Sequence, residues 1–160
     1  MKAEIIEFEK LILIGLKIST TLSEDNTFKL WNTFMKRRAE IKNRVDECYY
    51  SIQKYPNDVD MDSFTPITVF DKWAAVAVSE VTAIPNGMEV VEIAAGKFAK
   101  FRHFGAAADF FRTSQYIYGT WLPSSGYEIR DAHHFEIMEA DYKGPEDPNS
   151  EEDVFIPLKA

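Results

Sequence analysis

The stretch HHFEIMEADY, residues 133–142, places two histidines and a carboxylate in one short segment of extended character. Glu136 stands between Phe135 and Ile137, and a glutamate with such neighbours needs a positively charged or hydrogen-bonding partner. Four partners are possible: a metal ion, a proton, a bound ligand or water. Which of them meets Glu136 decides what chemistry the segment supports.

The two histidines do not predict a metal site. Adjacent residues of a strand point to opposite faces, so His133 and His134 cannot bind one ion together. No further Cys or His lies near them in the sequence to complete a ligand set. We therefore expect no metal and no other cofactor.

Three other segments look catalytic at first sight, but each lacks a required residue. AAGK suggests a phosphate loop, but Val91 stands where that loop needs its first glycine and Phe98 where it needs Ser or Thr. Ser124 and Ser125 follow a predicted helix and lack the Gly-x-Ser-x-Gly frame of a nucleophile elbow. The single cysteine, Cys48, is more typical of a small apolar residue than of a nucleophile.

Composition limits the function classes. The 160 residues are 46% hydrophobic, enough for a sizeable core in one domain, and they include 12 Phe, 7 Tyr and 3 Trp, more than a core of this size needs. The net charge of −8 opposes a phosphate backbone, so no direct nucleic acid binding is expected. The sequence shows neither a signal peptide nor a long apolar run. We expect a soluble cytoplasmic protein without membrane contact.

The pattern of apolar residues predicts two similar series of elements. The first comprises a strand at 9–20 with a bulge or close approach at Gly15, a helix at 27–44, and strands at 47–55 and 72–81. The second comprises a long strand at 88–105 bent at Gly96, a helix at 107–121 stopped by Pro123, one or two strands in 126–142, and a closing strand at 153–160.

The order strand, helix, strand, strand thus occurs twice, with an offset of roughly 80 residues. This predicts one α+β domain over 1–160, with pseudo-symmetric repeats at about 4–82 and 88–160. We expect an antiparallel sheet with both helices on one face and a ligand groove between the halves. The concave face is the expected place for the groove, with Glu136 projecting into it.

The segments EIAAGKFAKFRHFG, YGTWLPSSGYE, HHFEIMEADY and EEDVFIPLKA, in this order and spacing, resemble the GyrI-like effector-binding domain of AraC-type and MerR-type transcription regulators. That domain also occurs alone. The resemblance covers nearly the whole chain and is firmest in residues 93–158. It implies two strand-helix-strand-strand repeats around a central groove, with a glutamate matching Glu136 on the groove floor.

The resemblance also implies several functions. In multidrug-sensing relatives the matching glutamate meets lipophilic cations between aromatic walls, some other relatives are hydrolases, and one inhibits DNA gyrase. The pattern begins by about residue 4, which leaves no room for a helix-turn-helix and favours a stand-alone form. Met138 stands where many relatives carry a tyrosine, so part of the binding chemistry differs here.

The remaining candidate ligand-binding residues are aromatic. Tyr50, Tyr55, Trp73 and Phe98 lie on predicted strands, where alternation gives each about an even chance of facing the groove. Residues at helical spacing have a core role by default, and these are Trp31, Phe34, Phe110, Tyr118 and Trp121. Trp121 is nevertheless a candidate, because the implied fold brings that helix end near the groove mouth.

The predicted function is a stand-alone receptor for a small organic ligand, favouring a lipophilic cation held by the Glu136 carboxylate and by aromatic ring faces. One alternative is a hydrolase of reactive electrophiles with Glu136 as general base, so whether the chain is an enzyme stays open. The other is regulation of a protein partner, as in gyrase inhibition, through the acidic surface.

Overall fold

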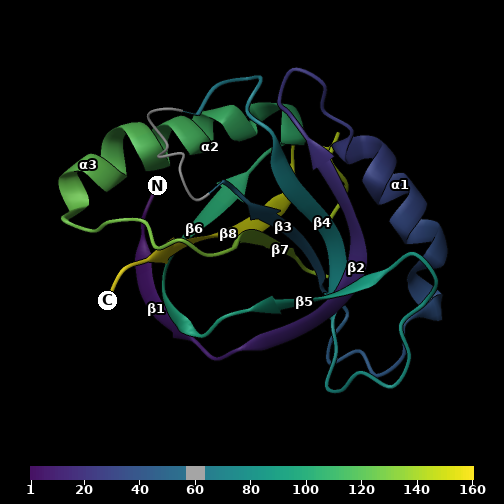
Figure 1. Ribbon diagram of the computed structural model, residues 1–160. Helices are drawn as coiled ribbons and strands as arrows, with labels where there is room; N and C mark the ends of the chain where they lie inside the picture. Colours follow the sequence, from purple (N-terminus) through teal and green to yellow (C-terminus); the bar gives the residue numbers. More distant parts are fainter. Residues whose placement is uncertain (57–63) are drawn as a thin grey trace.

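The computed structural model describes residues 1–56 and 64–160, which form one curled antiparallel sheet with helices outside it (Figure 1). The strands are β1 (Glu4–Phe8), β2 (Leu11–Thr20), β3 (Tyr49–Lys54), β4 (Phe70–Ala77), β5 (Glu89–Ile93), β6 (Gly96–Phe104), β7 (His134–Met138) and β8 (Glu151–Leu158). The helical segments are α1 (Thr27–Arg37), 3₁₀ turns at Arg38–Glu40 and Ala107–Asp109, α2 (Phe110–Tyr116), a π-helical turn at Ile117–Trp121, and α3 (Leu122–Ser125).

The strand order is β1-β6-β8-β7-β3-β4-β2-β5. The pairing of the strands near the two edges, β1 with β6 and β2 with β5, curls the sheet. β1 runs into β2 and β5 into β6, and these two long segments pair with each other on both sides of their bends. Glu4 pairs with Lys100 at one end of this ladder, and Gly15 pairs with Glu89 at the other. The sheet therefore closes on itself and acquires an inner and an outer face.

Aromatic rings fill the inner face. Phe135 stacks on Phe155 with ring centroids 4.7 Å apart, and Phe8 and Phe98 meet Phe135 edge to face at 5.5 and 5.4 Å. Except for Phe8, which is half-buried, each of these side chains is at most 3% exposed. The concave side is thus a packed core.

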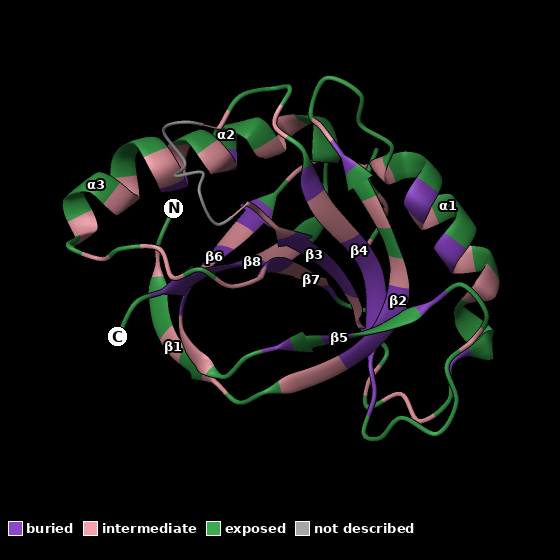
Figure 2. Cartoon of the chain, in the orientation of Figure 1, coloured by how far each residue is buried: buried purple, intermediate pink, exposed green. Residues whose placement is uncertain are grey.

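The helices cover the outer face, as Figure 1 shows. α1 packs against β2 and β4 through Leu30 and Phe34, the buried bands that Figure 2 shows on this helix. α2 and the π-helical turn pack on β6 and β8 through Phe110, Tyr116 and Ile117. The predicted α+β class with an antiparallel sheet and both helices on one face is confirmed.

Several predicted boundaries were wrong. The first helix ends at Arg37 rather than near residue 44, because a 3₁₀ turn follows. The second helical segment continues to Ser125, because Pro123 sits in the first turn of α3, where its missing N–H costs nothing. The long strand predicted at 88–105 is divided before Gly96, and only one strand, β7, forms within 126–142.

Gly15 marks a close approach of two strands, one of the two alternatives, bulge or close approach, that the sequence left open. A Cβ atom built on Gly15 would lie 2.0 Å from the carbonyl oxygen of Ala74. Only glycine therefore fits at this position of β2, opposite Ala75 of the paired strand β4.

The two predicted repeats agree with the arrangement of the strands, since β6, β8 and β7 mirror β2, β4 and β3 across the sheet centre. The boundaries of the repeats, 4–82 and 88–160, stay a prediction. No helix within the described residues has the length and apolar character needed to cross a membrane.

Candidate functional site

Glu136 lies on the outer face of the sheet, between the areas that the two helices cover. It pairs with Ser51 of β3 on one side and Val154 of β8 on the other. Directly paired residues share a face, and the same row continues to Ala74 under α1 and to Phe101 under α2. The expectation that Glu136 projects into the concave side is wrong, because the strand alternates and Phe135 takes the inner position.

A hydrogen bond from β3 holds the Glu136 carboxylate. Gln53 Nε2 donates to Glu136 Oε1 at 3.1 Å and also lies 3.3 Å from Ser51 Oγ. Gln53 itself is buried, whereas Glu136 is half-buried. The carboxylate is thus fixed in place while solvent still reaches part of the side chain.

A lysine and a second glutamate share the electrostatic environment of Glu136. Burial raises the pKa of Glu136, and the charge of Lys72 and the Gln53 hydrogen bond oppose that rise. Burial also raises the pKa of Glu152, and the negative charge of Glu136 raises it further while Lys72 lowers it. Within the described residues Lys72 makes no ion pair at contact distance with either glutamate. The three groups together carry one net negative charge when both carboxylates are ionised.

Three tyrosines lie in the field of this carboxylate. Burial raises the pKa of Tyr55 and of Tyr118, and the Glu136 charge adds to both shifts. The pKa of Tyr142 rises to about 12 for the same reason, with Glu152 contributing before Glu136. All three hydroxyls therefore stay protonated at neutral pH and can donate or accept hydrogen bonds.

His134 connects two of these tyrosines. Its Nδ1 lies 3.1 Å from Tyr118 Oη, and its ring meets the Tyr55 ring edge to face at 4.9 Å. Burial, with smaller contributions from Lys54 and His133, lowers its pKa to about 3, so the imidazole is neutral. We call the side chains described so far the Glu136 cluster: Gln53, Tyr55, Lys72, Tyr118, His134, Glu136, Tyr142 and Glu152.

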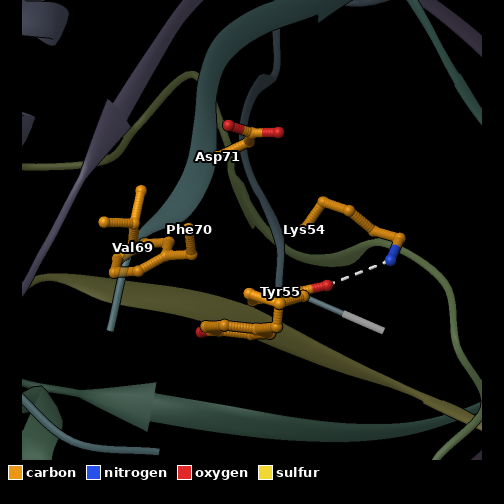
Figure 3. A pocket seen from close by; sticks show the side chains of 6 residues that line it. Lys54, Tyr55, Val69, Phe70 and Asp71 are labelled. Atoms are coloured by element: carbon orange, nitrogen blue, oxygen red, sulfur yellow. Dashed lines mark hydrogen bonds between the residues drawn. The ribbon is translucent and has the colours of Figure 1, made fainter. Parts of the chain in front are cut away.

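A hollow of about 300 Å³ adjoins the cluster at the ends of β3 and β4 (Figure 3). Tyr55 and Phe70 line it with their rings, whose centroids are 5.3 Å apart. The remaining lining residues are Lys54, Pro56, Val69 and Asp71. Tyr55 is thus shared by the hollow and the cluster. No group of three potential metal ligands gathers anywhere in residues 1–56 and 64–160.

The structure brings only one of the predicted aromatic residues, Tyr55, to Glu136. Tyr50, Trp73 and Phe98 lie on the inner face, because they occupy the other phase of the strand alternation. Tyr50 donates to Asp46 at 3.2 Å and Trp73 Nε1 to Glu89 at 2.8 Å, while Phe98 packs in the aromatic core.

Trp121 belongs to the packing between the helical segment and the sheet. It stacks on Tyr127 at 6.1 Å and meets Phe101 edge to face at 5.1 Å. Its contacts match the default core role of a residue at helical spacing, with no contact to Glu136 itself.

Several members of the cluster were missed by the sequence reasoning: Gln53, Lys72, Tyr118, His134, Tyr142 and Glu152. Those on strands had a usable signal, most directly His134, which stands two residues before Glu136 itself. Gln53 is two residues before Tyr55 on one strand, and Glu152 is two residues before Val154 on another, so alternation puts each on the face of its neighbour. Tyr118 and Tyr142 had none, because a helix and a loop deliver them.

The chain is similar to known proteins over its whole length. Residues 1–159 match the GyrI-like small molecule binding domain. The transcriptional regulator BrlR of Pseudomonas aeruginosa is 31% identical over 160 residues, covering 99% of this chain and 56% of BrlR, so the chain spans about half the length of that relative.

Solved structures with a similar fold include SAV2435 and the C-terminal domain of EcmrR. SAV2435 bound to tetraphenylphosphonium superposes with a TM-score of 0.75 at 14% identity, covering 100% of this chain and 95% of that one. The C-terminal domain of EcmrR gives a TM-score of 0.73 at 13% identity, with 99% and 97% covered. The domain match over nearly every residue, together with this fold, shows that the chain belongs to the GyrI-like small molecule binding domain family.

Proposed function

We propose that the chain binds lipophilic organic cations at the Glu136 cluster. The observation that carries this proposal is the state of the Glu136 carboxylate, which is fixed by Gln53, half-buried, and without an ion-pair partner at contact distance among the described residues. A carboxylate withdrawn from water is stabilised by an arriving positive charge. The raised pKa values of Glu136 and Glu152 have that same cause.

The surroundings of the carboxylate suit a cation that is also lipophilic. Tyr55 and Tyr118 offer ring faces, which attract positive charge through the quadrupole of the ring. With both carboxylates ionised, Lys72 reduces the net charge of the cluster to −1, which suits a monovalent cation. The similar protein SAV2435 was solved with tetraphenylphosphonium, a cation of this kind, and that likeness supports the proposal.

Binding of a matched pair of ions tests the proposal. Tetraphenylphosphonium and tetraphenylborate have nearly the same shape and opposite charges, so titration calorimetry with both separates charge recognition from apolar adsorption. We expect saturable binding of the phosphonium and none of the borate at the same concentration. Equal binding of both ions, or of neither, would contradict the proposal.

The two alternative functions stay predictions. A hydrolase would require Glu136 to activate a water molecule, and turnover of an activated ester that is lost in Glu136→Gln would mark it. A regulatory protein partner would be marked by a stable complex in which the acidic surface is covered.

A further inference from the structure

His134 is a buried polar residue of the Glu136 cluster, 5% exposed, and it meets both aromatic walls of the proposed cation site. We propose that His134 fixes the direction of the Tyr118 hydroxyl proton, so that Tyr118 presents oxygen lone pairs to the ligand and the site favours cations that carry an N–H group. This inference rests on the proposed function and adds a specificity-determining residue to it.

The first step concerns where the Tyr118 proton goes. A neutral imidazole has one nitrogen that accepts and one that donates, and Nδ1 of His134 is 3.1 Å from Tyr118 Oη. A phenol is the stronger donor of the two groups and imidazole nitrogen the stronger acceptor, so the favoured bond runs from Oη–H to Nδ1. The low pKa of His134, about 3, excludes the doubly protonated ring, which would donate from both nitrogens.

The second step concerns the competing acceptor. The Glu136 carboxylate also lies near Tyr118, since its charge raises the pKa of that tyrosine. Within the described residues, however, Glu136 accepts its hydrogen bond from Gln53 and Tyr118 has its one hydrogen bond with His134. His134 therefore keeps the Tyr118 proton away from the carboxylate.

The third step concerns what a ligand meets. With its proton held by His134, the Tyr118 oxygen adds an acceptor to the space that the Glu136 carboxylate already makes electron-rich. An ammonium with an N–H group can donate a hydrogen bond to one of these oxygens while its charge interacts with the other. A quaternary cation has no N–H group and interacts through its charge alone. The local backbone is consistent with a specialised role, because Tyr118 stands in a π-helical turn, a feature frequent at functional sites.

Two substitutions separate the acceptor from the shape of the ring. In His134→Asn the side-chain oxygen can take the place of Nδ1 and still accept from Tyr118, whereas His134→Leu fills the space and accepts nothing. In the leucine variant the Tyr118 proton is free to turn toward Glu136. The probes are protonated imipramine, a tertiary ammonium with one N–H, and its quaternary N-methyl derivative.

We expect the preference of wild type for imipramine over the N-methyl compound to be on the order of tenfold, the scale of one charged hydrogen bond. That preference should persist in His134→Asn and fall in His134→Leu, where Tyr118 no longer offers its lone pairs and Glu136 is the remaining acceptor, with quaternary affinity little changed. An equal preference in wild type and His134→Leu, or a loss in both variants alike, would overturn the inference.

A second readout needs neither a ligand nor a variant. Long-range proton–nitrogen NMR correlation distinguishes protonated from unprotonated imidazole nitrogens, and we expect His134 at neutral pH to carry its proton on Nε2 with Nδ1 unprotonated. A proton on Nδ1 would refute the proposal, because His134 would then donate to Tyr118. Failure of tetraphenylphosphonium to bind, with the expected tautomer observed, would refute the proposed function instead.

Discussion

Glu136→Gln is the substitution that tests the cation site most directly. Glutamine keeps the shape of the side chain and can still accept from Gln53 through its amide oxygen, so the hydrogen bond at 3.1 Å has an equivalent in the variant. What disappears is the charge. Any loss of cation affinity therefore reports on electrostatics and not on packing.

The size of the loss follows from the neighbours of the carboxylate. Tetraphenylphosphonium has no hydrogen-bond donor, so its interaction with the carboxylate is Coulombic, and two unit charges roughly 6–10 Å apart attract by about 1.5–3 kcal/mol at an effective dielectric constant of about 20. Lys72 already offsets part of the negative charge and Glu152 remains in the variant, so we expect a value near the middle, about 2 kcal/mol, or roughly a 30-fold weaker Kd for tetraphenylphosphonium. Fold stability should be unchanged or slightly higher, because a buried charge has been removed.

The pH dependence of cation binding provides a second test of the role of Glu136. Burial raises the pKa of Glu136, so protons compete with the cation as pH falls through that value. The phosphonium itself does not titrate. Binding by wild type should therefore strengthen as pH rises, and the dependence should be shallower in Glu136→Gln, where only Glu152 still titrates within the site.

Titration calorimetry over a series of pH values measures both effects, and thermal melts of the same samples report on folding. Glu139→Gln is the matched control, because it removes the same charge from an exposed position just beyond the end of β7. The reasoning is refuted if Glu136→Gln and Glu139→Gln bind the phosphonium equally well. A Glu136→Gln variant that does not fold would show that the role of this carboxylate is structural.

Three further outcomes are expected. The pKa of Glu152 is raised in the folded protein, so the folded state holds its proton more tightly and the stability of the fold falls as pH rises above about 4.5. Glu152→Gln should flatten this fall and raise Tm at pH 8 by roughly 2–4 °C. An unchanged melting curve would contradict this expectation. Gly15→Ala should lower the free energy of unfolding in urea by ~3 kcal/mol, because its Cβ would strike the Ala74 carbonyl. The control Gly119→Ala has open space around the new Cβ and should cost no stability. Equal urea midpoints for the two variants would be the contrary result. The net charge of −8 predicts no retention of duplex DNA at physiological salt, and a mobility shift at micromolar protein would overturn that expectation.

The position of Glu136 shows which features follow from the local sequence and which depend on contacts between distant segments. The alternation that separates His133 from His134 also puts Phe135 and Glu136 on opposite faces, since the period of a strand is set by the backbone alone. It could not say which face is the packed core. That depends on Glu4 pairing with Lys100 and Gly15 with Glu89, contacts between segments far apart in the chain that curl the sheet and seal its inner side.

The same limit explains the aromatic residues. Tyr50, Trp73 and Phe98 have the composition of a ligand wall, but the curl places them in the core, and only Tyr55 shares the face of Glu136. Tyr118 has the spacing of a core residue, but its hydroxyl reaches His134 across the gap between a helix and the sheet.

The sequence by itself determined the α+β class, the two helices with their apolar faces, a special backbone position at Gly15 and the acidic character that opposes nucleic acid. These follow from local periodicity, from side-chain volume and from counted charges, none of which needs a partner elsewhere in the chain. The tertiary structure alone decided that Gln53 bonds Glu136, that Lys72 and Glu152 interact with it electrostatically, and that His134 meets Tyr118. Those neighbours come from four separate strands and a helical turn, and only the closing of the sheet brings them within reach of one another.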